Sequence, residues 1–127
     1  MAYESFVGLL VILNTHLILL LFVENYPLVF DPEIAKQLEK VARDMQIKTI
    51  LTKMFDRIEE NGSNAGKLID PTLFLYKLKN KHPPLRLYFK HKLDTNEIYL
   101  FSFEMKTSEQ KQRESIERIR FKSRHLF

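Results

Sequence analysis

Cysteine and tryptophan are absent from this chain, and glycine occurs only three times in 127 residues. Without cysteine, the protein has no disulfide bond, no thiolate zinc site and no cysteine nucleophile. This fits a reducing compartment, and we expect a cytoplasmic protein. The scarcity of glycine also weakens the one candidate phosphate loop, Gly66-Lys67-Leu68, because the glycine spacing of a P-loop is missing. A connection between a helix and a strand is the better interpretation of that segment.

One long apolar run occupies the N-terminal part of the chain, from Phe6 to Val23. Only three polar residues interrupt it, namely Asn14, Thr15 and His16. Its length is close to the ~20 apolar residues that span a bilayer as a helix. The run is therefore a candidate membrane anchor, through which the protein would contact a membrane.

Two other interpretations of this run stay open. A secretory signal peptide is disfavoured, because no Lys or Arg precedes the run and no small-residue cleavage site follows it. Alternatively, the run lies outside the natural protein if translation starts at Val23. We therefore divide the chain into an apolar segment, residues 1–23, and a domain, residues 24–127.

The domain is expected to begin with a short strand and two helices. Tyr26–Phe30 is a short apolar run that predicts a strand. Asp31 is a favourable N-cap, and Pro32 follows it at the first helical position. Apolar residues recur at helical spacing from Ile34 to Met45 and again from Ile47 to Glu60. Because almost no loop separates the two, we expect an antiparallel helical hairpin packed on a sheet.

The second half of the domain is expected to hold a sheet and a last helix. A loop is predicted over Ser63–Pro71. Three strands separated by turn residues are predicted after it, at Leu73–Leu78, Leu85–Lys90 and Ile98–Phe103. The last helix starts at Thr107 or Ser108 and has a narrow apolar stripe of Ile116, Ile119 and Phe121, so it should dock weakly. The predicted fold class is α+β, with a small, mainly antiparallel sheet.

Positive charge is concentrated in this half. From Pro71 to Phe127 the chain has 13 Lys and Arg against 6 Asp and Glu, a net charge of +7, whereas the rest has a net charge of −3. Side chains alternate between the two faces of a strand. This alternation places four cations opposite the apolar core face, with Lys106 in reach: Lys77, Lys79, Arg86 and Lys90. Such a face suits a phosphate backbone, although solvating surface charges are the plainer alternative.

In this order, the segments resemble the RelE/ParE superfamily of toxins from type II toxin–antitoxin operons. Tyr26–Leu38 is similar to the opening strand and capped helix of the family, and Ala65–Leu68 to the lead-in to its second strand. Leu75–Lys79 and Leu85–Phe89 are similar to two of its strands, the latter with a central Arg. Phe101–Thr107 is similar to a segment with paired lysines near its end, especially in the HigB and phage Gp49-like branch. The resemblance covers nearly everything after the apolar run.

The resemblance implies a toxin that cleaves messenger RNA on the ribosome, without a metal or cofactor, and that pairs with a cognate antitoxin. The antitoxin is expected to lay an apolar or acidic helix over the cationic sheet or to displace the last helix. In the ribonuclease members, a ribose 2′-OH attacks the adjacent phosphorus. That chemistry needs a base, an acid and positive charge on the phosphate.

Three matched positions are the expected catalytic residues. Arg86 would stabilise phosphate charge as a permanently protonated fork. Lys77, or its neighbour Lys79, would act as the base if surrounding cations lower its pKa. Lys106 would be a second phosphate clamp or the acid. Four basic residues are expected to contact the nucleic acid, namely Lys79, Lys81, His82 and Lys90.

The chain also departs from the ribonuclease pattern. Met105 replaces the first of the paired lysines, and the region Lys111–Arg113 lacks the tyrosine that some ribonuclease members carry. His82 and His91 are candidate substitutes as acid–base groups. These departures keep two alternatives open. One is a ParE-like inhibitor of a protein target such as DNA gyrase, and the other is an inactive or membrane-tethered homologue.

Overall fold

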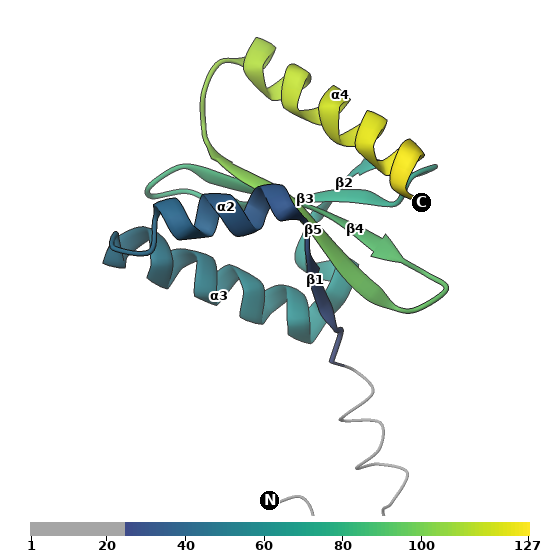
Figure 1. Ribbon diagram of the computed structural model, residues 1–127, viewed down its shortest axis with the longest axis horizontal. Helices are drawn as coiled ribbons and strands as arrows, with labels where there is room; N and C mark the ends of the chain where they lie inside the picture. Colours follow the sequence, from purple (N-terminus) through teal and green to yellow (C-terminus); the bar gives the residue numbers. More distant parts are fainter. Residues whose placement is uncertain (1–24) are drawn as a thin grey trace, which may run out of the picture.

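The computed structural model describes residues 25–127, so the predicted roles of the apolar run lie outside the described residues (Figure 1). The elements are β1 (Leu28–Phe30), α2 (Pro32–Lys40), α3 (Met45–Asn61), a short 3-10 helix (Gly62–Ala65), β2 (Lys67–Asp70), β3 (Leu75–Asn80), β4 (Leu85–Lys92), β5 (Glu97–Met105) and α4 (Glu109–Leu126). The predicted α+β class is confirmed. Within residues 25–127, each helix is too short or too polar to cross a bilayer.

The five strands form one sheet in the order β1-β5-β4-β3-β2. Only β1 runs parallel to its neighbour, β5, and the other pairs are antiparallel. Helices α2 and α3 form an antiparallel hairpin on one face, and α4 crosses the other face (Figure 1). The predicted helical hairpin on a mainly antiparallel sheet is therefore confirmed.

Strand β2 corrects the sequence prediction, which had a loop over Ser63–Pro71. It pairs with β3, and a register shift separates Leu68 from Asp70. A four-residue strand at the edge of a sheet is too short to show an alternating pattern, and Leu68 is exposed. The predicted strand Leu73–Leu78 also begins two residues later, at Leu75. Phe74 has a φ of 54° and belongs to the turn.

The sheet carries an apolar core on each face. Towards the hairpin, residues of α2 and α3 pack against the sheet: Ile34, Leu51, Met54 and Ile58 meet Leu78, Leu87, Phe89 and Leu100. On the opposite face, a smaller cluster joins the sheet to α4 through Leu75, Tyr88, Phe101 and Ile119. The second face is therefore partly covered by α4.

Helix α4 docks through polar as well as apolar contacts. Of its predicted apolar stripe, Ile119 is buried, but Phe121 is 61% exposed. Four of its polar side chains contact the rest of the domain: Ser115 with Glu104 (2.6 Å), Arg118 with Glu33 (2.8 Å), Arg120 with Asp70 (2.9 Å) and Lys122 with Asp31 (2.7 Å). Charged contacts therefore supplement the narrow apolar stripe.

Asp31 is the most deeply buried of these partners, at 1% exposure. It caps α2 by accepting from the Glu33 amide at 2.9 Å, and it accepts from the Tyr99 hydroxyl at 2.5 Å. Burial alone would raise the pKa of Asp31. The hydrogen bonds from Lys122, Tyr99 and Glu33 outweigh burial, so this pKa lies below its usual value.

We therefore expect Asp31 to make the fold acid-sensitive. Because the pKa of Asp31 is lower in the folded state than in the unfolded chain, its contribution is complete above about pH 4 and is lost as the pH falls further. Asp31→Asn should remove about 2 kcal/mol of unfolding free energy at pH 7 and flatten the acid dependence. Urea unfolding at several pH values would measure both effects.

Asp44 provides the matched control. It also caps a helix, since its carboxylate accepts from the Ile47 amide at 3.1 Å, but this contact is exposed. Asp44→Asn should therefore change stability much less. Equal losses in the two variants would contradict the role given to the buried cluster around Asp31.

Candidate nucleic-acid interface

A cleft of about 380 Å³ lies where the β3–β4 loop meets the end of β5. Eight residues line it: Lys79, Asn80, Lys81, His82, Pro84, Leu85, Arg86 and Lys106. Five of them are site residues predicted from the sequence, namely Lys79, Lys81, His82, Arg86 and Lys106. Segments that are distant along the chain thus contribute their basic side chains to one cleft.

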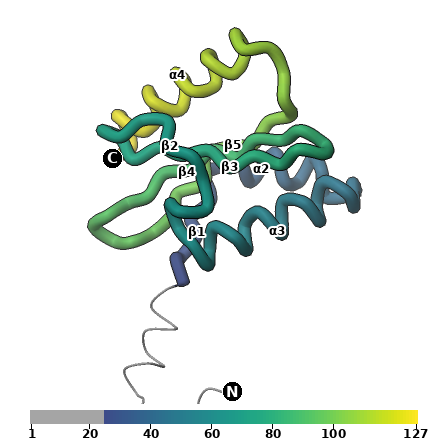
Figure 2. The backbone as a smooth tube through the Cα atoms, turned by 180° about the vertical axis from the view of Figure 1, so that it is seen from behind, coloured from purple at the N-terminus to yellow at the C-terminus, as the bar shows by residue number. Residues whose placement is uncertain are grey.

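Backbone pairing explains how the cleft forms. Lys79 and Arg86 are direct partners across β3 and β4. The Lys106 amide donates to the Pro84 carbonyl at 2.8 Å, which holds the end of β5 against the β3–β4 loop. Within that loop, the Asn80 side chain donates to the Pro83 carbonyl at 2.9 Å. Figure 2 shows the β3–β4 loop beside the connection from β5 to α4.

Lys77 lies next to this cleft on β3, on the same strand face as Lys79. Its cross-strand partners are Tyr88 on β4 and Lys67 on β2. Burial lowers the pKa of Lys77, and the nearby charges of Lys79, Arg86 and Lys67 lower it further. A lysine with a lowered pKa is a better base near neutral pH than an ordinary lysine.

Arg86 is 6% exposed and faces a carboxylate. Its Nη1 lies 3.9 Å from Oε1 of Glu104, which is its register partner on β5. Nη1 is buried and has no hydrogen-bond partner. The guanidinium therefore has one hydrogen-bond donor without an acceptor, although an oppositely charged carboxylate lies nearby.

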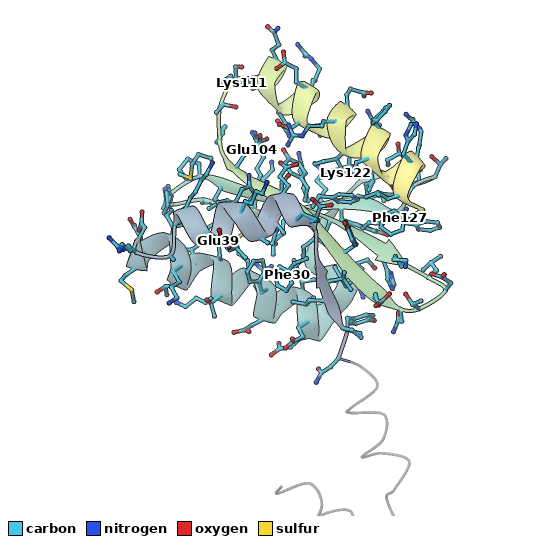
Figure 3. The ribbon with its side chains drawn as sticks, in the orientation of Figure 1. Phe30, Glu39, Glu104, Lys111, Lys122 and Phe127 are labelled. Carbon is cyan, nitrogen blue, oxygen red and sulfur yellow. The ribbon has the colours of Figure 1, made fainter. Side chains whose placement is uncertain are left out.

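The Glu104 carboxylate accepts hydrogen bonds from two hydroxyl groups. The Tyr88 hydroxyl donates to Oε1 and the Ser115 hydroxyl to Oε2, each at 2.6 Å. Figure 3 shows Glu104 between the sheet and α4. Burial and the hydrogen bond to Glu104 raise the pKa of Tyr88, so this tyrosine stays protonated. Glu104 thus connects the Arg86 side of the cleft to the last helix.

Comparisons with known proteins rest on structure alone, because no protein-family model and no curated sequence matches the chain. A doubly substituted Escherichia coli toxin RelE in the free state superposes with a TM-score of 0.58 and 22% identity, over 75% of this chain and 98% of that chain. The domain has the fold of RelE. The predicted fold is thereby confirmed.

Two further E. coli structures are less similar. The isolated RelE toxin gives a TM-score of 0.48 at 24% identity, over 74% of this chain and 98% of that chain. The intact RelBE toxin–antitoxin complex gives 0.46 at 19% identity, over 65% and 99%.

Two predicted residues lie away from the cleft of this RelE-like domain. Lys90 is on the expected sheet face, but it is buried, and its Nζ donates to the Leu73 carbonyl at 2.6 Å. The same Nζ lies 5.4 Å from the centre of the Phe127 ring. His91 follows it and contacts the Asn96 side chain at 2.8 Å near the β4–β5 turn. The nucleic-acid contact of Lys90 and the acid–base role of His91 stay predictions.

Glu104 and Ser115 were not among the residues predicted from the sequence. The one signal in the sequence is that Glu104 is an acidic residue between the apolar residues Phe103 and Met105. Its partner could not be derived, because the β4–β5 register shifts between Tyr88 and Phe89. Within residues 25–127, side chains of His, Asp and Glu form no group of three suited to a metal ion.

The Lys77 environment can be tested by removing one neighbouring charge. Lys79→Gln should raise the pKa of Lys77 towards that of an ordinary lysine, because a repelling cation is lost. An NMR pH titration of the lysine side chains would measure the shift. Lys48→Gln, at an exposed position of α3, is the matched control and should leave the pKa of Lys77 unchanged. If Lys77 had the same pKa in both variants, the charge of Lys79 would not influence it.

Proposed function

We propose that this protein is the toxin of a type II toxin–antitoxin system and cleaves messenger RNA in the ribosomal A site. The observation that carries the proposal is the convergence of Lys79, Lys81, Arg86 and Lys106 on one cleft, with Lys77 beside it. The RelE fold supports it, since E. coli RelE is a toxin with this architecture. A row of cations on one face suits a polyanion better than a neutral substrate.

The proposed reaction is an internal transesterification. The 2′-oxygen of the ribose bonds to the adjacent phosphorus, and the bond from phosphorus to the 5′-oxygen breaks. The 2′-OH proton passes to a base, for which the lowered pKa of Lys77 favours that residue over an ordinary lysine. The departing 5′-oxygen receives a proton from Lys106, or from a protonated His82, both of which line the cleft.

Arg86 has the central electrostatic role in this proposal. The pentacoordinate phosphorus carries more negative charge than the substrate, so a fixed cation stabilises it selectively. Burial on strand β4 restricts the position of the Arg86 side chain. Its buried Nη1 has no hydrogen-bond partner, so this donor would gain an acceptor only if the side chain rearranged around a bound phosphate.

A cognate antitoxin is the proposed protein partner. The cleft is lined by five basic side chains, so an acidic helix laid across it would neutralise charge and exclude RNA. Displacement of α4 remains the second proposed mode of binding. In either mode the antitoxin and the RNA compete for the same half of the domain.

One observation favours the ParE-like alternative, in which the protein inhibits a protein target without cleaving RNA. Glu104 lies 3.9 Å from Arg86 and offsets part of its charge. A carboxylate beside the phosphate site opposes RNA binding. The two functions differ in whether messenger RNA is cut.

Induction of the full chain in bacterial cells, with mapping of RNA 5′ ends, tests the proposal. We expect growth arrest together with new 5′ ends inside translated messages. Arg86→Ala should reduce cleavage about 100-fold, as expected when one transition-state donor is removed. Arg57→Ala is the matched control, because Arg57 is exposed on α3 on the opposite side of the sheet.

The remaining outcomes separate the alternatives. Arrest with intact messenger RNA would overturn the ribonuclease and favour inhibition of a protein target. Full cleavage by the Arg86 variant, at matched protein levels, would remove this residue from the mechanism. Absence of arrest and of cleavage in the wild type would favour the inactive homologue.

A further inference from the structure

The contacts of Glu104 have a consequence for Arg86. Both carboxylate oxygens already accept a hydroxyl hydrogen bond, from Tyr88 and from Ser115. The distance from Oε1 to Nη1 of Arg86, 3.9 Å, is too long for a hydrogen bond. The buried Nη1 is thus left without an acceptor next to a carboxylate that could serve as one.

We propose that Ser115 and Tyr88 hold Glu104 away from Arg86, so that the guanidinium stays available for a phosphate group. Glu104 is then a positioning residue, and Ser115 is the point at which α4 acts on the cleft. The phosphate as ligand rests on the proposed function. The restraint itself rests on the contacts between the four side chains.

Charge and geometry explain why the hydroxyls are needed. A carboxylate and a guanidinium normally close to about 2.8 Å in a charge-assisted hydrogen bond, often with two parallel bonds. Such a pair would occupy the donors that a phosphate oxygen needs. Two short hydrogen bonds from neutral donors, one on β4 and one on α4, fix the carboxylate in the more distant position.

Ser115 provides the test, because it lies on α4 and does not line the cleft. In Ser115→Ala, Oε2 of Glu104 loses its donor, and the carboxylate should turn to the unpaired Nη1. The affinity for inorganic phosphate, measured by NMR on the Arg86 guanidinium signals of the full chain, should fall about fivefold, the loss expected for about 1 kcal/mol. The same signals should show slower rotation of the guanidinium in the absence of phosphate.

Two companion variants isolate the carboxylate. Ser115→Thr keeps the hydroxyl and should restore the wild-type phosphate affinity. With Glu104→Gln already present, Ser115→Ala should change the affinity less than twofold, because no carboxylate remains to pair with Arg86. This coupling is not expected if Ser115 only supports packing.

Arg118→Ala is the control for loosening of α4, since it removes another docking contact, to Glu33, without touching Glu104. It should leave phosphate binding unchanged. An equal loss in Arg118→Ala, an unchanged affinity in Ser115→Ala, or a wild type that does not bind phosphate would each overturn the inference. Intact messenger RNA in cells, with the Ser115 effect present, would overturn the proposed function alone.

Discussion

The structure depends on a central strand that is buried on both sides. Leu85 to Lys90 of β4 are all buried, with alternate side chains directed to the helical hairpin and to α4. Its neighbours β3 and β5 pair with it along nearly its whole length. The elements packed on both faces therefore determine the surroundings of any buried charged residue on this strand. Arg86 and Lys90 are the two buried charged residues of β4.

Much of this arrangement follows from local patterns. The alternation along β3 and β4 correctly assigned four cations to one face, namely Lys77, Lys79, Arg86 and Lys90. A register error of one residue would have turned these charged side chains towards the hairpin core, so the pattern determines the face strongly. The N-cap at Asp31 placed the start of α2 correctly. The covering of the second face was not predictable, because the α4 stripe contributes little apolar surface. Its docking depends on charges whose partners are distant in sequence, such as Lys122 and Asp31.

The cleft could be predicted only in part, for a similar reason. Alternation assigns a residue to one face of the sheet, but it does not show which residues of that face line the same cleft. Lys90 and Arg86 share a face, yet Lys90 lies near the end of α4 and contacts Leu73. Glu104 was missed because its role depends on a strand register with a bulge and on a helix that follows a loop. Long-range pairing of this kind comes from the tertiary fold alone.

Stability does not account for the Arg86–Glu104 contact. Opposite charges about 4 Å apart attract by ~4 kcal/mol at the effective dielectric constant near a protein surface. Removing each ion from water costs several kcal/mol, and an orphaned donor adds to the cost. An apolar pair of similar size would therefore stabilise β4 and β5 at least as well. The fold alone therefore gives no reason for a buried guanidinium with an unpaired donor beside a cationic cleft, whereas the proposed phosphate ligand would give one.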